Sequence, residues 1–291
     1  MEKLTLTGKK DFKKRIFAPP SKSYSHRMIL SAALSDGISR IENLIFSKDV
    51  LATLDFAKKC GAYVFRGENF AEIKGGKAPD EAEIFCGESA STLRFVIPVL
   101  AAKGIKAHIT GAGRLMHRPL DVYTEIFDEK GINYRYEKGE FFDINSCIPS
   151  GIYNVRGDVS SQFITGLLYA LPLLSGNSEI NITTPLMSKP YIDITLDVLK
   201  RSGIEIENDN FKTFKIKKNQ KYLPLNAAVP GDFSQCCPFV AAALFAGHIE
   251  MLNLDLKSLQ GDKKIIEYSK ALGGRIFANE SKITVEKSNL T

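Results

Sequence analysis

Four short turns in the sequence combine glycine or proline with small hydroxyl side chains, a composition suited to holding an anion. The richest lie around Ser21, Ser23 and Ser25, and around the adjacent Ser160 and Ser161. A single Ser at a helix start is explained by N-capping, in which its oxygen accepts a backbone N–H bond. Capping does not explain several hydroxyls in one turn. The turns read PPSKSYSHR from Pro19, CGESASTLR from Cys86, GDVSSQF from Gly157 and GDFSQCC from Gly231.

Cations stand in or beside the same turns. Lys22 and Arg27 belong to the first turn and Arg94 to the second. A cation at a helix start opposes the helix macrodipole, so its role there is not helix stability. Helix N-termini bind phosphates and carboxylates through their free N–H groups. We therefore expect an anion-binding cleft, with a basic rim exposed to solvent as the alternative; further cations precede later helices at Arg114, Arg118 and Lys189.

The elements that must carry these turns repeat along the chain. Each turn lies between a predicted strand and an apolar helix, and each helix is followed by a glycine. These glycines are 67, 72 and 71 residues apart, at Gly37, Gly104, Gly176 and Gly247. A fixed period of this length indicates a repeated structural unit.

A second helix follows each first one and ends close to another glycine. Glycine favours the left-handed residue that follows a helix. Stretches with alternating apolar residues come next, which predicts two strands joined as a hairpin. Each unit is therefore predicted to read strand, helix, strand, helix, strand, strand, in an α/β fold. The second helices are expected over 48–60, 118–130, 189–202 and 261–272.

The two kinds of helix differ in the burial that they predict. The second helices carry one apolar stripe, as in Leu120, Tyr123 and Phe127, so one face should pack on a core. The first helices are apolar nearly all round, as in FITGLLYALPLL from Phe163. A helix of that kind is expected to be buried centrally.

Composition excludes several classes of protein. A length of 291 residues suggests about two domains. The 44% of hydrophobic and 25% of charged residues are ordinary for a globular chain. The net charge of +6 is scattered, so no nucleic-acid partner is expected. The longest apolar runs fall short of a membrane span, and the N-terminus carries no apolar signal segment.

Cysteine and histidine spacing predicts neither disulfides nor a metal site. The five cysteines are odd in number and contain no Cys-x-x-Cys pair, and the four histidines show no His-Glu-x-x-His spacing. Reduced thiols favour a cytoplasmic location. No nucleophile triad is visible, so a binding site for small anions is the chemistry that the residues favour.

Six motifs occur in a fixed order over most of the chain: PPSKSYSHR, CGESASTLRF, GAGRLMHRPL, GDVSSQFITGLL, SKPYIDITLDVL and GDFSQCCPFVAAA. Together they resemble the enolpyruvyl transferase family, and within it the 5-enolpyruvylshikimate-3-phosphate synthases. The resemblance implies an inverse β-prism, an inside-out αβ barrel of βαβαββ units, in two domains. It implies attack of the 5-hydroxyl of shikimate-3-phosphate on C2 of phosphoenolpyruvate, with loss of phosphate and without a metal or organic cofactor.

Matching motif positions carry the family's ligand contacts to this chain. The resemblance implies a shikimate-3-phosphate site formed by Lys22, Ser23, Arg27, Ser160, Ser161, Gln162 and Ser188, with Tyr191 nearby. It implies a phosphoenolpyruvate site formed by Lys22, Ala90, Arg118 and Gln162. Arg suits this role because its planar fork donates two bonds to a carboxylate or phosphate.

Two departures from the family pattern alter these expectations. Ala90 stands where many members have glycine, so its methyl group should narrow the phosphoenolpyruvate end and make the protein insensitive to glyphosate. Four units are present where the family has six. The family's catalytic Asp and Glu fall in the later units, so no catalytic residue is assignable here and the chain is expected to be truncated.

The resemblance places a complete three-unit domain at 20–230 and an incomplete second domain at 1–19 and 231–291. Substrate is expected in the cleft between them, and the complete enzyme is expected to be a monomer with no membrane partner. The alternative is a fragment that binds phosphoshikimate without turnover. A UDP-sugar enolpyruvyl transferase is disfavoured because GAGRLMHRP lacks Cys, and an RNA cyclase because the basic charge is scattered.

Overall fold

The computed structural model describes residues 11–279 and 282–290, and within them the βαβαββ unit occurs four times. The first repeat is β1 (Phe12–Phe17), α1 (Lys22–Leu34), β2 (Ser39–Glu42), α2 (Lys48–Lys59), β3 (Tyr63–Arg66) and β4 (Ala71–Lys74). The second is β5 (Glu81–Phe85), α3 (Ala90–Ala102), β6 (Lys106–Thr110), α4 (Asp121–Lys130), β7 (Tyr134–Glu137) and β8 (Phe141–Ile144).

The third and fourth repeats follow the same order. The third is β9 (Ile152–Val155), α5 (Ser161–Ala170), β10 (Ser178–Ile182), α6 (Lys189–Arg201), β11 (Ile206–Asp209) and β12 (Thr213–Ile216). The fourth is β13 (Ala227–Ala228), α7 (Phe233–Ala246), β14 (Gly247–Leu252), α8 (Ile265–Ala271), β15 (Arg275–Ala278) and β16 (Lys282–Glu286). The predicted α/β class and element order are confirmed. Short 3₁₀ turns lie at Leu115–His117, Leu171–Leu173 and Gly261–Lys264.

The strands form four sheets of four strands each, and the second and third repeats each supply one complete sheet. In the second repeat the order is β5-β6-β8-β7, with β5 parallel to β6 and the β7–β8 hairpin antiparallel. A parallel pair needs a long crossover connection, which α3 provides between β5 and β6. The third repeat has the equivalent order β9-β10-β12-β11.

The first and fourth repeats exchange their first strands. Strand β1 pairs in parallel with β14, from Phe12 opposite Gly247 to Phe17 opposite Leu252, although more than 200 residues separate them. Strand β13 pairs in parallel with β2 instead. The chain accordingly divides into two compact units, one of Met1–Ser21 with Pro230–Thr291 and the other of Lys22–Val229.

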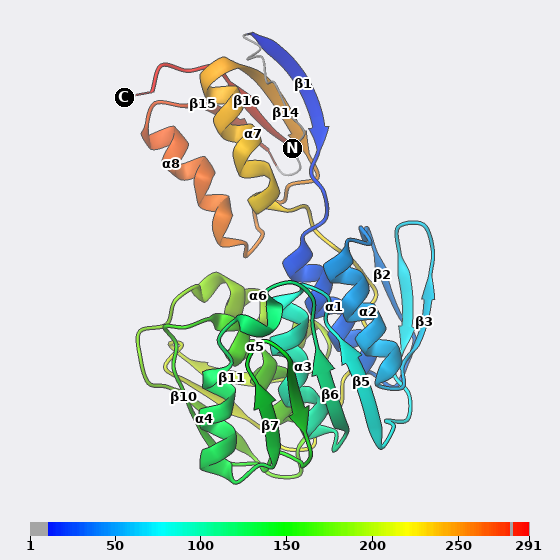
Figure 1. Ribbon diagram of the computed structural model, residues 1–291. Helices are drawn as coiled ribbons and strands as arrows, with labels where there is room; N and C mark the ends of the chain where they lie inside the picture. Colours follow the sequence, from blue (N-terminus) through cyan, green and yellow to red (C-terminus); the bar gives the residue numbers. More distant parts are fainter. Residues whose placement is uncertain (1–10, 280–281, 291) are drawn as a thin grey trace. The chain divides into compact units, whose positions relative to one another are not determined.

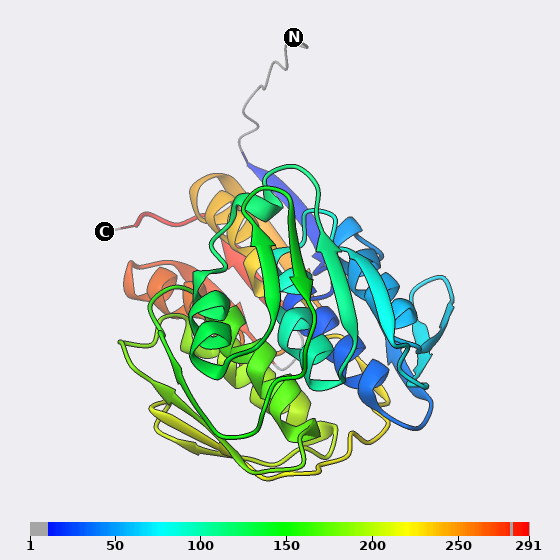
Figure 2. The ribbon, with the colours of Figure 1, turned by 60° about the horizontal axis from the view of Figure 1, so that its bottom comes forward.

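In unit Lys22–Val229 the three sheets lie around the first helices α1, α3 and α5, and the second helices pack with one face buried (Figure 2). The first helices α1, α3 and α5 form its centre, as their apolar sequences predicted, and every residue of α3 from Thr92 to Ala101 is buried. Helices α3 and α5 approach closely at Gly166, where an added Cβ would lie 2.6 Å from the Arg94 carbonyl oxygen. Only glycine fits that crossing.

The other unit contains one sheet, β1-β14-β16-β15, against which α7 and α8 pack (Figure 1). Helix α7 was also predicted to be buried centrally, and this is wrong for one of its faces. Its Phe239 and Phe245 side chains are 43% and 70% exposed. In the other unit three first helices cover one another, whereas the described residues of this unit contain a single repeat and no first helix that could cover α7.

The second helices end as predicted. Each is followed by a glycine with positive φ, at Gly61, Gly131, Gly203 and Gly273. The start of α4 differs from the prediction, because residues 115–117 form a 3₁₀ turn and Arg118 is extended before Asp121 begins the helix. Within the described ranges, no helix is both long and apolar enough to span a membrane.

Candidate functional site

A pocket of about 260 Å³ lies in unit Lys22–Val229 where the starts of four helices converge. Its walls come from α1, α3, α5 and α6 and from the segment before α4. Three arginines and six hydroxyl side chains, five of them serines, dominate the wall, and no described residue of the lining carries a carboxylate. The lining is Ser23, Arg27, Ser91, Arg94, Phe95, Arg118, Ser160, Ser161, Gln162, Ser188 and Tyr191.

Arg27 is the most deeply buried of these cations, with 2% of its surface exposed. Its Nε donates to Thr195 Oγ1 at 2.8 Å, and its Nη atoms donate to the carbonyls of Ser23 and Tyr191 at 2.9 and 3.1 Å and to Thr165 Oγ1 at 3.4 Å. Burial lowers the pKa of Arg27 to about 10, so the group stays charged at neutral pH. All of these partners are neutral, which leaves its charge uncompensated for an anion.

Arg94 forms the second buried cation and fixes a neighbouring amide. Its Nη1 donates to Gln162 Oε1 at 2.8 Å, and its Nη2 donates to the carbonyl of Pro119 at 3.0 Å. Arg has no acceptor, so the Gln162 oxygen must face it and the amide NH₂ must turn away. That NH₂ donates to Ser91 Oγ at 2.9 Å. Arg94 therefore connects α3, α5 and the segment before α4.

The α5 start places two serines at the pocket. Ser160 caps the helix, accepting from the Gln162 N–H, and Ser161 is the first helical residue. Gly157 allows this turn to approach the one before α6, because an added Cβ would lie 3.0 Å from the Leu186 Cα. The Gly157 N–H donates to Thr184 Oγ1 at 2.9 Å and holds the two turns together.

Ser188 shows a backbone conformation that favours glycine. Its φ of 59° and ψ of 40° lie in the left-handed region, which costs a residue with a Cβ about 1 kcal/mol. Its side chain makes no capping bond to α6 and lines the pocket instead. Strain that persists at such a position is typical of a functional turn.

The remaining predicted residues lie at the pocket in different ways. Arg118 is exposed and lines it, and its guanidinium forms no ion pair with any described residue. Lys22 and Ala90 are not part of the lining. The Lys22 ammonium pairs with Asp49 at 2.8 Å, and Ala90 begins α3 immediately before Ser91.

Motif matching brought most of this wall together but missed three residues. Ser23, Arg27, Arg118, Ser160, Ser161, Gln162 and Ser188 were predicted, and all line one pocket. Ser91, Arg94 and Phe95 line it too but received no ligand contact from the motif match, although the charge pattern had placed Arg94 at the expected anion-binding cleft. The repeat also pointed to a ligand role for Arg94, since Arg27 and Arg94 both stand ten residues before the glycine that follows their helix.

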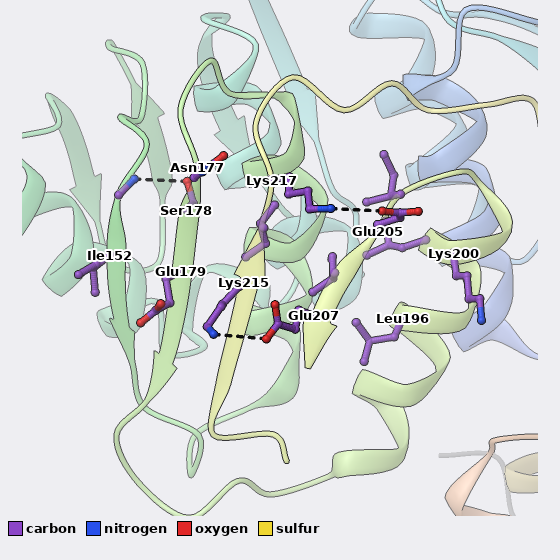
Figure 3. A pocket seen from close by; sticks show the side chains of 15 residues that line it. Ile152, Asn177, Ser178, Glu179, Leu196, Lys200, Glu205, Glu207, Lys215 and Lys217 are labelled. Carbon is purple, nitrogen blue, oxygen red and sulfur yellow. Dashed lines mark hydrogen bonds and ion pairs between the residues drawn. The ribbon is translucent and has the colours of Figure 1, made fainter. Parts of the chain in front are cut away.

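A larger pocket of about 780 Å³ lies elsewhere in the same unit, along β9, β10, β12 and β11 and beside α6 (Figure 3). Its lining carries three Glu and three Lys side chains, so its charges are balanced, and four of them form ion pairs. Lys215 contacts Glu207 at 3.3 Å and Lys217 contacts Glu205 at 3.8 Å. It lacks the uncompensated positive charge of the smaller pocket, so volume alone does not identify the site.

Comparison with known proteins identifies the family. Residues 6–291 match the model of the family described as EPSP synthase (3-phosphoshikimate 1-carboxyvinyltransferase). The chain belongs to the EPSP synthase family. The predicted resemblance is therefore confirmed at the level of the family.

Two relatives show how much of the family's length is present. The chain is 44% identical over 284 residues to a 3-phosphoshikimate 1-carboxyvinyltransferase of Clostridium novyi, covering 93% of this chain and 65% of that protein. It is 44% identical over 279 residues to the protein of the same name from Clostridium kluyveri, covering 94% of this chain and 65% of that protein. The chain thus spans slightly less than two thirds of these EPSP synthase family members.

A solved EPSP synthase from Acinetobacter baumannii has a similar fold. It matches with a TM-score of 0.81 and 22% identity, over 98% of this chain and 67% of that one. Identity at this level supports the fold of the family member described here and not its chemistry.

Proposed function

We propose that the pocket binds shikimate-3-phosphate and that the protein takes part in enolpyruvyl transfer from phosphoenolpyruvate in the shikimate pathway. The observation that carries the proposal is the set of three guanidinium groups in one small pocket without a carboxylate in its described lining. Uncompensated charge behind a wall of hydroxyls suits a phosphate ester of a polyhydroxylated ring.

In this proposal Ser160, Ser161 and Ser188 hold the 3-phosphate, while Lys22, Ser23 and Arg27 contact the rest of shikimate-3-phosphate. Arg27 spends four of its five N–H donors on the protein, so it acts mainly through its charge. Gln162 lies between the two substrates, and Lys22, Ala90 and Arg118 form the phosphoenolpyruvate end.

The reaction proposed is attack of the 5-hydroxyl on C2 of phosphoenolpyruvate, protonation of C3 and expulsion of phosphate from the tetrahedral intermediate. Residues 1–291 supply binding groups, and we assign no catalytic acid or base among them. We further propose that unit Lys22–Val229 is an inverse β-prism and that the protein is cytoplasmic, which its five unpaired thiols suit.

Calorimetric titration of shikimate-3-phosphate into the 291-residue chain tests the proposal. Saturable binding is expected, with at least a tenfold weaker Kd in Ser161→Ala. Ser234→Ala is the matched control, because Ser234 is an exposed residue in the first turn of α7. Absence of binding at millimolar ligand would contradict the assignment of shikimate-3-phosphate as the ligand of this pocket. Binding without phosphate release on addition of phosphoenolpyruvate would identify a binding fragment.

A second pair of variants separates the pocket from general basic charge. Arg118 and Arg114 belong to the same exposed segment, but only Arg118 lines the pocket. Phosphoenolpyruvate affinity measured at saturating shikimate-3-phosphate is expected to fall at least tenfold in Arg118→Ala. Arg114→Ala should stay within twofold of the parent. Equal losses in both variants would indicate nonspecific attraction.

The most detailed part of the proposal is that the protein is insensitive to glyphosate. A methyl group at position 90 leaves less room beside Ser91 than the glycine of many family members. Glyphosate binding at saturating shikimate-3-phosphate is expected to tighten at least tenfold in Ala90→Gly, with little change for phosphoenolpyruvate. Micromolar glyphosate binding by the parent chain would refute this part.

A further inference from the structure

Four buried polar side chains form a continuous chain of hydrogen bonds through the centre of unit Lys22–Val229. His26 Nδ1 lies 2.6 Å from Thr53 Oγ1, Thr53 Oγ1 lies 2.8 Å from Thr92 Oγ1, and Thr92 Oγ1 donates to Ser89 Oγ at 2.8 Å. Each of the four residues is at most 2% exposed. The chain joins α1, α2 and the N-cap of α3.

Counting protons gives this chain a direction. A hydroxyl has one proton, and the proton of Thr92 is donated to Ser89. The Thr53 hydroxyl lies 2.8 Å from Thr92 Oγ1 and also 3.3 Å from the Asp49 carbonyl oxygen. Because Thr92 has no second proton, Thr53 donates across the shorter contact and accepts from His26, so the imidazole proton is assigned to Nδ1. His26 Nε2 is then a bare nitrogen, and it is buried without a hydrogen-bond partner among the described residues. Burial lowers the pKa of His26 to about 3, in agreement with a neutral ring.

This series of hydrogen bonds ends at the N-cap of α3, next to the turn of that helix that lines the pocket. Ser89 accepts the Thr92 N–H at 3.2 Å, and its carbonyl accepts the Leu93 N–H at 3.1 Å, so it fixes the first turn. Ser91 and Arg94 of the following residues line the pocket. Helix α1 does not depend on this chain alone, because Arg27 ties it separately to α6 through Thr195.

Equivalent positions in the second and third repeats indicate that the Thr53 hydroxyl connects its helix to a first helix. Thr53, Tyr123 and Thr195 each stand eight residues before the glycine that follows their helix. All three send a hydroxyl to the first helices: Tyr123 donates to the Arg94 carbonyl at 2.5 Å, and Thr195 accepts from Arg27. Of these three hydroxyls, that of Thr53 is connected to a helix N-cap, because Thr92 bonds both to Thr53 and to the N-cap residue Ser89.

We propose that His26, Thr53 and Thr92 are positioning residues that hold the first turn of α3 in place and thereby set the affinity of the pocket for the anion lying against Ala90 and Ser91. This inference rests on the proposed function, in which that anion is phosphoenolpyruvate. None of the three residues lines the pocket.

The test replaces Thr53 on α2 and measures amide hydrogen exchange in the first turn of α3. Thr53→Val keeps the shape and removes the hydroxyl, and Thr53→Ser keeps the hydroxyl. In the ligand-free chain, amide hydrogen exchange at Thr92 and Leu93 is expected to become at least tenfold faster in Thr53→Val and to stay within threefold in Thr53→Ser. Thr124→Val is the matched control, because the Thr124 hydroxyl bonds to the Asp121 carbonyl of its own helix and to the Tyr134 side chain of β7.

The ligand measurement separates positioning from general destabilisation. Phosphoenolpyruvate affinity at saturating shikimate-3-phosphate is expected to fall at least tenfold in Thr53→Val, while shikimate-3-phosphate affinity stays within threefold. Unchanged exchange, or equal loss of both affinities, would overturn the inference. If the parent protein binds neither ligand, the proposed function fails. The hydrogen-exchange experiment still decides whether the hydrogen bonds from His26 to Ser89 hold the first turn of α3. Should Thr53→Val not fold, Thr92→Val against Thr92→Ser gives the same comparison at Leu93.

Discussion

Arg94 donates to the side-chain oxygen of Gln162 at 2.8 Å and so determines which way that amide points. The amide NH₂ then donates to Ser91, which precedes Arg94 by three residues on the same helix α3. Neither partner is acidic, so the guanidinium orients a neutral group and keeps its charge available. The same cation also holds the Pro119 carbonyl, next to Arg118.

Replacing this arginine should weaken ligand binding with only a moderate loss of stability. In Arg94→Lys a single ammonium cannot reach both Gln162 and Pro119 in the fork geometry of a guanidinium. We expect shikimate-3-phosphate affinity to fall about tenfold, equivalent to about 1.4 kcal/mol, in calorimetry. Arg135→Lys on the exposed face of β7 is the control and should bind as the parent does. Unchanged affinity in Arg94→Lys would show that the Gln162 amide keeps its orientation without the guanidinium of Arg94.

The close crossing of α3 and α5 predicts a steric cost at Gly166. In Gly166→Ala the new methyl group would meet the Arg94 carbonyl at 2.6 Å and the Tyr123 hydroxyl. Overpacking against backbone costs about 1–3 kcal/mol, and the free energy of unfolding in urea should fall by at least the upper part of that range.

Gly131→Ala provides the comparison for Gly166→Ala. Its Cβ would meet nothing within 4 Å, but its φ of 63° is left-handed, so only about 1 kcal/mol of backbone strain is expected. Equal losses in the two variants would mean that α3 and α5 can separate without cost.

The buried His26 predicts a loss of stability in mild acid. Its pKa is lowered from 6.5 to about 3 by burial, with opposing influence from Asp49 and further lowering from Lys22 and Arg27. Between these values the unfolded chain binds a proton that the folded chain does not, so stability falls as pH falls. From pH 7.5 to 5.5 this group removes about 1.4 kcal/mol.

Urea unfolding of the parent chain and of His26→Asn at both pH values measures this contribution. Asn cannot titrate, so the variant should lose about 1.4 kcal/mol less than the parent between pH 7.5 and 5.5. The comparison cancels the titration of other groups common to both chains. Identical pH dependence in the two proteins would mean that His26 is protonated inside the fold.

The thiols should differ sharply in reactivity. Cys60 and Cys86 are buried, and burial raises the pKa of each to about 12, so at pH 8 only about one thiol in 10,000 is ionised. Cys147 is exposed. Brief treatment of the folded chain with iodoacetamide, followed by peptide mass spectrometry, should modify Cys147 first. The unfolded chain should react at all five positions, and early modification of Cys86 would contradict the burial.

Much of the fold follows from local patterns in the sequence. The 70-residue period, the glycines after the second helices and the apolar first helices depend on neighbours in the chain, so they are visible without coordinates. The wall of the pocket follows similarly, because Ser23, Arg27 and Ser161 occupy turns whose hydroxyls exceed what capping requires. The Ser188 strain and the exposed face of α7 have no such local signature.

Contacts between distant residues were decided only by the tertiary structure. The exchange of β1 and β13 depends on pairing between strands far apart in the sequence, β1 with β14 and β13 with β2, for which neighbouring residues give no signal. The bonds from Arg94 to Gln162 and from Thr53 to Thr92 cross 68 and 39 residues. The sequence determined by itself which side chains carry charge and hydroxyls at the helix starts. Which of them meet, and which are buried without a counter-charge, depends on how three helices pack at one centre.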